Sequence, residues 1–310
     1  MIVRIARNYD TPDIRKQTPG NSFEWDGIQF TEEPVEKCDY LVVFNHPKED
    51  FTVNVRKGGT LLLIQEPPYE RLAKFKRFIP LYDYVFSDFE TDHPGNFRKP
   101  AALPWHIGKS YDELKALKVE DLSKDKLVSC VTSNSNMNPG HKPRLDFLDY
   151  LNKQEFDFDL MGRGFQPIAD KFDGVAPYKY TIAIENYKAE NYWTEKIVDC
   201  FLSHTMPIYH GCPNITDYFP KESLIEIDIN DPKSALEIIE EAIANQKWEK
   251  NQEAITHARE KILDEYQFFP FVTKFIREHP PGDEFHKVTI PHYIGDPPPS
   301  FFKRLFGKKS

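Results

Sequence analysis

The segment that decides the fold is Tyr178–Pro220, which reads YKYTIAIENYKAENYWTEKIVDCFLSHTMPIYHGCPNITDYFP. A β-type run, Tyr180–Ile184, is followed by a polar loop and then by an amphipathic helix expected from Thr194 to about Ser203. A second apolar run, Pro207–Tyr209, ends at a glycine. Strand, loop, helix and strand in this order predict a βαβ unit, in which ligand-binding groups lie at the carboxyl ends of the strands.

Polar side chains stand at those ends. The first strand is followed by Glu185 and Asn186, and the expected helix opens with Glu195 and Lys196. Since parallel strands end at the same edge of a sheet, these four side chains are expected to meet there. We therefore place the functional site in this segment.

The same segment resembles the signature of the α-1,3/4-fucosyltransferases, glycosyltransferase family 10. The resemblance is carried by short motifs in a fixed order: Ala183–Asn186, Tyr192–Lys196, Pro207–Ile208, Gly211, Pro213–Asn214 and Tyr218–Pro220. It implies the GT-B fold, an α/β architecture of two Rossmann-like domains facing a cleft, with the nucleotide-sugar held mainly by the C-terminal domain.

Charge and hydropathy exclude other classes. The net charge is −9, from 40 basic and 49 acidic residues, which argues against a nucleic-acid partner because phosphates require a basic face. No apolar run approaches the roughly 18 residues that span a bilayer, and residues 1–10 suggest a first strand rather than a signal peptide. We expect a cytoplasmic protein, with Cys200 and Cys212 as buried free thiols.

Alternating strands and helices continue along the chain. They predict two Rossmann-like domains, over 1–120 and 121–278. The resemblance implies that the first is the acceptor-side domain and the second the nucleotide-sugar-binding domain. The expected strands are short and rich in β-branched or aromatic residues: 2–5, 40–44, 60–64, 84–86, 126–132, 158–161, 180–184, 207–209 and 224–227. Helices are expected at 69–78, within 140–153, after the Asp231 cap and over 247–266.

Residues 279–310 are expected to form a Pro-rich and basic amphipathic tail, extended or loosely attached. Its last part, Phe301–Ser310, alternates large apolar with basic side chains. This pattern suits peripheral contact with the inner face of an anionic membrane; a disordered tail, or one packed on its own domain, is an equal alternative.

Two cations are candidates for the diphosphate of the donor. Lys196 lies in the first turn of its helix, where free N–H groups and the dipole attract anions; the alternative is an exposed lysine. Arg144 follows a loop after the strand 126–132, and the resemblance implies a similar arginine on the diphosphate. Its alternative is a surface ion pair, and Lys142 and Arg163 are rivals.

Three further residues are implied by the resemblance to position the donor: Glu195, Asn186 and Tyr192. Glu195 has an alternative role as a helix-dipole or capping residue. Tyr187 stands where the family usually has Ser, and this difference leaves the identity of the donor sugar open.

Glu66 is our candidate for the catalytic base. It follows the strand 60–64 in a rigid Gln-Glu-Pro-Pro sequence, where partial burial would raise its pKa. The resemblance implies a glutamate base at this position; a solvated loop glutamate is the alternative. Asp88, Glu90 and Asp92 form a competing acidic cluster, but their spacing is loose and the expected fold requires no metal.

Together these features predict an inverting glycosyltransferase without a required cofactor. GDP-fucose is the expected donor, and a glycan or glycolipid of a cell surface or lipopolysaccharide is the expected acceptor. Stimulation by a divalent cation is left open. Two alternatives remain: a related transferase that uses another nucleotide-sugar, and a non-catalytic nucleotide-binding or scaffold protein that kept the fold.

Overall fold

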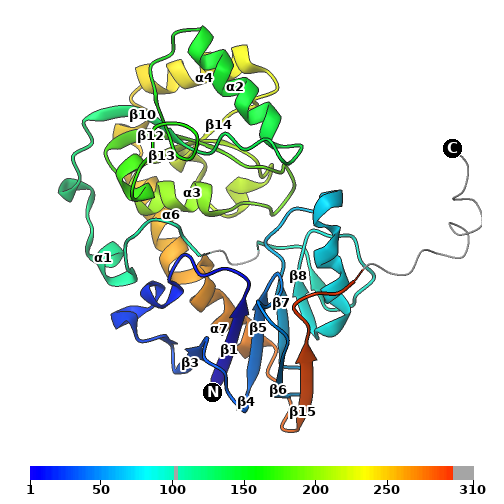
Figure 1. Ribbon diagram of the computed structural model, residues 1–310. Helices are drawn as coiled ribbons and strands as arrows, with labels where there is room; N and C mark the ends of the chain where they lie inside the picture. Colours follow the sequence, from blue (N-terminus) through cyan, green and yellow to red (C-terminus); the bar gives the residue numbers. More distant parts are fainter. Residues whose placement is uncertain (101–103, 296–310) are drawn as a thin grey trace, which may run out of the picture.

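Two α/β domains, each built on a mainly parallel sheet, make up most of the computed structural model, which describes residues 1–100 and 104–295 (Figure 1). The N-terminal sheet has the order β2-β3-β1-β5-β7-β8-β9, and only β2 and β3 pair antiparallel. Its strands are β1 (Ile2–Arg7), β2 (Glu24–Trp25), β3 (Ile28–Thr31), β5 (Tyr40–Phe44), β7 (Thr60–Leu63), β8 (Tyr84–Phe86) and β9 (Asn96–Phe97).

The central strands of this sheet are buried on both faces. In β5, Tyr40, Val42 and Phe44 pack into one hydrophobic core, whereas Leu41 and Val43 pack into another on the opposite face. Successive strand residues point to opposite faces, so a continuous apolar run is what a doubly covered parallel strand requires. The predicted strand 40–44 is confirmed for this reason.

The C-terminal sheet is wholly parallel, in the order β11-β10-β12-β13-β14. Its strands are β10 (Lys126–Val131), β11 (Asp159–Met161), β12 (Tyr178–Ile184), β13 (Met206–His210) and β14 (Ile225–Glu226). The helices of this domain include α2 (His141–Lys153), α3 (Glu195–Leu202) and α4 (Pro232–Ala244). The βαβ unit β12-α3-β13 is confirmed, and Asp231 caps α4 as predicted, accepting a hydrogen bond from the Ser234 N–H.

The chain then returns to the N-terminal domain, which corrects the predicted limit at residue 278. Helix α7 (Phe268–Glu278) buries Phe268, Phe269 and Val272 in the core beneath the N-terminal sheet, and it lies behind that sheet in Figure 1. Its amphipathic face is apolar enough to cover a sheet. The second domain therefore ends before α7.

The prediction of a loose tail from residue 279 is also wrong for its first part. Residues Phe285–Ile290 form β15, which pairs antiparallel with β6 (Phe51–Arg56), and β6 in turn pairs with β4 (Lys37–Cys38). The alternation of polar and apolar residues in β15 is typical of a strand with one solvated face. The segment Phe301–Ser310 lies outside the described residues.

Two predicted helices differ in detail. The helix expected over 247–266 is divided into α5 (Lys247–Lys250), α6 (Gln252–Lys261) and a π-helical turn, Ile262–Tyr266, with a break at Asn251. The expected helix 69–78 is a 3₁₀ segment, Glu70–Leu81. A short helix α1 (Tyr111–Ala116) lies between the two sheets, and no helix among the described residues has the length and apolar character needed to cross a bilayer.

Candidate active site

Arg144 is a buried cation at the carboxyl edge of the C-terminal sheet. It lies in the first turns of α2 and is only 4% exposed. Its Nη1 donates to Asn186 Oδ1 at 2.7 Å and its Nη2 donates to the Ser133 carbonyl at 3.0 Å. Burial lowers the pKa of the guanidinium, and its Nε has no hydrogen-bond partner among the described residues. A buried guanidinium without a carboxylate is suited to a ligand anion.

The rivals of Arg144 do not share this environment. Lys142 pairs with Asp146 at 2.5 Å on the exposed side of α2, and Arg163 is exposed. Of these three cations, Arg144 alone lies inside the fold, so the predicted alternative of a surface ion pair does not apply to it.

Lys196 lies at the N-terminus of α3, which begins where the sequence predicts and has Thr194 as its N-cap. Its Nζ lies 3.2 Å from Glu195 Oε1 and 3.3 Å from Glu185 Oε2, and it donates to Thr194 Oγ1 at 2.9 Å. Burial lowers the pKa of Lys196, but the two carboxylates more than offset this and hold the pKa above its usual value. The ammonium therefore stays charged at neutral pH, beside the positive end of the helix dipole.

Glu195 shares this environment. Burial raises the pKa of its carboxyl, but Lys196, His106 and Lys171 together bring it well below the usual range. Because its side chain is 21% exposed, it remains within reach of a ligand hydroxyl as well as of Lys196.

Glu185 anchors the start of α3 and Lys196, a structural role that the sequence analysis did not assign to it. Its side chain is fully buried, and it accepts hydrogen bonds from the Thr194 N–H at 2.8 Å and from Thr194 Oγ1 at 2.7 Å. With its contact to Lys196, it fixes both the start of α3 and the ammonium. The signal was available, because a glutamate at the end of a buried strand needs a cation or several donors.

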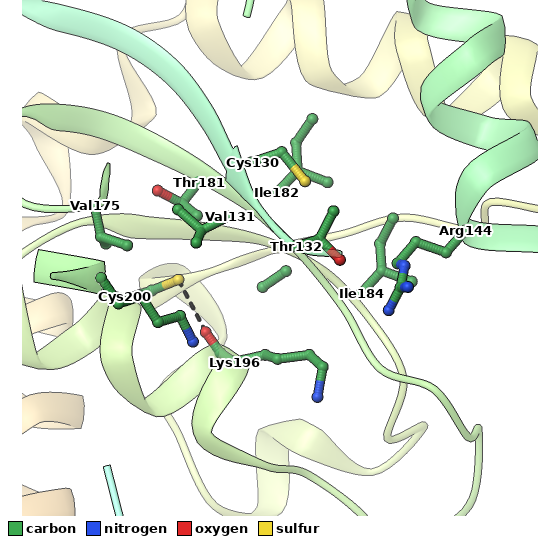
Figure 2. A pocket seen from close by; sticks show the side chains of 12 residues that line it. Cys130, Val131, Thr132, Arg144, Val175, Thr181, Ile182, Ile184, Lys196 and Cys200 are labelled. Atoms are coloured by element: carbon green, nitrogen blue, oxygen red, sulfur yellow. Dashed lines mark hydrogen bonds between the residues drawn. The ribbon is translucent and has the colours of Figure 1, made fainter. Parts of the chain in front are cut away.

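A small cavity lies between Arg144 and Lys196. Arg144, Lys171 and Lys196 line it together with the ends of β10 and β12. In Figure 2 the Arg144 and Lys196 side chains extend from α2 and α3 toward the same region. Lys171 pairs with the fully buried Asp199 at 2.7 Å, so it is a third cation at the cavity wall. The cavity itself is only about 20 Å³, but two helix N-termini meet at it and Arg144 has no carboxylate partner among the described residues, which suits an anionic group at its mouth.

Glu66, the predicted base, belongs to the other domain. It follows β7 at the carboxyl edge of the N-terminal sheet and is half-buried. Burial raises the pKa of its carboxyl, an effect that Arg71 and Lys196 oppose and Glu195 reinforces. Glu66 is therefore near enough to Glu195 and Lys196, at the start of α3, to interact with them electrostatically. A carboxyl with a raised pKa beside a donor site has the properties of a general base.

Two tyrosines link the domains next to Glu66. The Tyr69 hydroxyl donates to the Asn186 carbonyl. The Tyr69 ring packs edge-on against the Tyr187 ring, with 5.6 Å between the ring centres. Tyr187 in turn packs edge-on against Tyr192 at 5.3 Å. Asn186 is therefore held by both domains, since its side chain contacts Arg144 and its carbonyl contacts Tyr69.

Asp88 is a second carboxylate on the N-terminal side. It follows β8, the strand next to β7, and lines a narrow interdomain cavity with Gln65 and Tyr192. Burial raises its pKa to about 6, while Arg98 acts in the opposite direction. The other two members of the predicted acidic cluster, Glu90 and Asp92, are exposed. Within residues 1–100 and 104–295, no three His, Cys, Asp or Glu side chains are grouped so as to hold a metal ion.

Two mainly parallel α/β domains in one chain are the architecture of the GT-B fold. A solved α1,3-fucosyltransferase structure has the same fold, with a TM-score of 0.51 and 20% identity, covering 91% of this chain and 90% of that one. Residues 122–253 match the model of "Glycosyltransferase family 10 (fucosyltransferase) C-term". The matched residues make up most of the second domain of this chain.

Curated relatives match this chain over part of their length. An α-(1,3)-fucosyltransferase of Helicobacter pylori is 32% identical over 96 residues, which are 29% of this chain and 20% of that protein. The human 4-galactosyl-N-acetylglucosaminide 3-α-L-fucosyltransferase 9 is 30% identical over 131 residues, 40% of this chain and 35% of that protein. The chain therefore aligns with about a fifth to a third of the length of these relatives.

Proposed function

We propose that this protein is an inverting fucosyltransferase that transfers L-fucose from GDP-fucose to a hydroxyl group of a glycan. The observation that carries the proposal is the position of Arg144 and Lys196 on one cavity, with Glu66 close enough across the domain interface for its pKa to respond to Lys196. The match of residues 122–253 to the glycosyltransferase family 10 model supports fucose as the sugar.

In this mechanism Arg144 and Lys196 bind the diphosphate and stabilise the charge that develops on GDP as it leaves. Glu195, Asn186 and Tyr192 position the sugar and the nucleoside. Glu66 accepts the proton of the acceptor hydroxyl, whose oxygen bonds to the anomeric carbon while the bond to GDP breaks. Attack from the face opposite GDP inverts the configuration at that carbon.

The acceptor is proposed from the relatives. One of them is named for action on a 4-galactosyl-N-acetylglucosaminide, so a lactosamine unit is the first acceptor to test. A cell-surface glycan or lipopolysaccharide, a cytoplasmic location and peripheral membrane contact all stay predictions.

A nucleotide screen tests the donor. Thermal unfolding is measured with GDP, UDP and CMP and their sugars, for the wild type and for Lys196→Ala. A ligand that binds the native state raises its apparent stability, and we expect this only with GDP and GDP-fucose, with the increase lost in Lys196→Ala. Stabilisation by UDP or CMP alone would replace the donor, and stabilisation by none of them would contradict the proposal.

A further inference from the structure

A pocket of about 290 Å³ lies within the N-terminal domain, and the mechanism above gives no role to any residue that lines it. Its wall is formed by residues 4–7 of β1, by residues 47–49 after β5 and by Phe51 at the start of β6, together with Tyr9, Asp10 and Glu32. All of these residues belong to the first domain, so the pocket is separate from the donor cavity in the second domain.

Arg4 is a buried cation of this pocket, and no carboxylate of the described residues lies within ion-pair distance of it. The residue is 8% exposed, and its guanidinium lies over the Phe51 ring, with 4.2 Å from Cζ to the ring centre. Its Nε is enclosed and has no hydrogen-bond partner among the described residues. Nη1 and Nη2 bond to no described residue either, but they are not enclosed, so this end of the side chain is the part that reaches the pocket. Burial lowers the pKa of Arg4, and the exposed Glu49 opposes this effect without pairing with Arg4.

The other cations of the pocket already have carboxylate partners. Arg7 donates to both carboxylate oxygens of Glu32, at 2.5 and 3.1 Å, and to a backbone carbonyl at 2.7 Å. Lys48 pairs with Asp10 at the surface. Among the described residues that line the pocket, Arg4 is therefore the buried charge that is left without a partner.

An unpaired buried charge is unfavourable, because burial removes it from water and nothing in the fold replaces the lost hydrogen bonds. Stacking on Phe51 gives a weak attraction but leaves the N–H groups of the Arg4 guanidinium unbonded. A guanidinium presents these groups in a planar fork that matches a carboxylate or a phosphate. The pocket is comparable in volume to the smallest sites for small molecules, about 300 Å³. It therefore suits an anionic group carried by a molecule of about the size of a sugar.

Tyr9 connects this pocket to the segment of the proposed base. It lines the pocket, and its hydroxyl donates to Gln65 Oε1 at 2.7 Å, next to Glu66 in the chain. An acidic substituent of a glycan acceptor and a free sugar phosphate present the same chemistry to Arg4, since both combine an anionic group with hydroxyls.

We propose that this pocket is an anion site that binds the phosphate or carboxylate group of a sugar-sized molecule, with Arg4 as its bidentate hydrogen-bond donor. The site goes beyond the proposed function, because fucose transfer to a neutral glycan does not need it. It predicts that anionic sugars bind to the protein even when the donor site is full.

Isothermal titration with saturating GDP tests the site, because GDP occupies Arg144 and Lys196 and keeps other anions away from them. The probes are glucose 6-phosphate and glucuronate, with glucose as the neutral counterpart, and we expect both anions to bind and glucose not to bind. Arg4→Met should weaken the binding of both anions at least about tenfold, which is roughly the contribution of one hydrogen bond to a charged group. Arg4→Lys, which keeps the charge without the planar fork, should lie between the two.

Arg15→Met is the matched control, because Arg15 lies over the Phe23 ring at 5.4 Å but is exposed. It should bind both anions as the wild type does. Unfolding in urea without added anion shows whether each variant is folded and separates a ligand site from a packing role. Since Arg4→Met removes an uncompensated buried charge, it should unfold at the same or a higher urea concentration than the wild type.

Transfer assays distinguish the two sources of the anion. If the anion is part of the acceptor, Arg4→Met lowers kcat/KM for lactosamine that carries a carboxylate but not for neutral lactosamine, and glucuronate competes with the acidic acceptor. If it is a free sugar anion, glucuronate binds without competing with either acceptor, and Arg4→Met treats the two acceptors alike.

Three results would overturn the anion site: no binding of either anion by the wild type, anion binding that Arg4→Met leaves unchanged, or a lower urea midpoint for Arg4→Met, which would assign Arg4 to packing. The titration requires no transfer. The absence of transfer from any nucleotide-sugar would therefore overturn the proposed function alone, and the difference in anion binding between the wild type and Arg4→Met would still decide the anion site.

Discussion

Replacing Glu185 by Gln should weaken both the fold and the donor site. The substitution keeps the shape of the side chain but removes a fully buried charge that holds Lys196 at 3.3 Å and accepts two hydrogen bonds from Thr194 at 2.7 and 2.8 Å. Removing one partner of a buried pair leaves the other charge uncompensated, at a cost of about 3–5 kcal/mol. Lys196 keeps its contact with Glu195, so we expect a loss of about 2–3 kcal/mol.

Glu249→Gln is the matched control. Glu249 pairs with Lys179 at 2.6 Å in the same domain, but the two side chains are 36% and 30% exposed. The change of charge is the same, yet exposed pairs contribute only about 0–1 kcal/mol because water screens them. The difference between the two variants therefore isolates the effect of burial.

Equilibrium unfolding in urea measures the free energy of unfolding of each variant, and titration with GDP measures its affinity. We expect Glu185→Gln to lose stability and to bind GDP about tenfold more weakly, because the Lys196 ammonium is no longer held in place. Equal stability losses in Glu185→Gln and Glu249→Gln would refute the argument from burial. Unchanged GDP affinity in Glu185→Gln would refute the link from Glu185 through Lys196 to the donor.

Three other substitutions separate the remaining roles. Glu66→Gln should lower kcat by about 10²–10⁴-fold with GDP affinity retained. Since burial raises the pKa of Glu66 above 4.5, kcat/KM of the wild type should fall on acidification through an ionisation above pH 4.5. A fall that begins only at or below pH 4.5 would count against Glu66 as the base. Arg144→Lys cannot keep both contacts, to Asn186 and to Ser133, so GDP affinity should fall at least about tenfold, and an unchanged affinity would remove Arg144 from the site. Asp88→Asn should raise the free energy of unfolding by about 2–3 kcal/mol at pH 7.5, because burial raises the Asp88 pKa from 3.8 to about 6 and the folded state thus favours the protonated form. This gain in the free energy of unfolding should shrink as the pH falls through 6 and vanish below about 4. An equal gain at pH 7.5 and at about pH 4 would show that it has another cause.

The sequence predicts most where burial is complete. The central strands of both large sheets carry apolar runs because other elements cover both of their faces, as at Tyr40–Phe44 and at β12. The cap Thr194 and the helix it opens follow from local chemistry alone. The positions of Glu66, Arg144 and Lys196 at strand or helix ends could be predicted for the same reason.

Long-range contacts could not be predicted. Helix α7 and strand β15 complete the N-terminal domain from the far end of the chain, and neither carries a local signal for the partner it joins. The contact of Tyr69 with the Asn186 carbonyl also depends on how the two domains meet. Glu185 was placed at the site but given no role, because its neighbours in space, Thr194 and Lys196, follow a loop that the sequence leaves undefined.

The central claim is that this site catalyses inverting transfer of fucose with Glu66 as its base. The most direct measurement is NMR analysis of the product formed from GDP-β-L-fucose and lactosamine, for the wild type and for Glu66→Gln. We predict an α-linked fucoside with the wild type and none above background with Glu66→Gln, although the variant still binds GDP. A β-linked product, equal product from both proteins, or GDP binding without any product from the wild type would contradict the account.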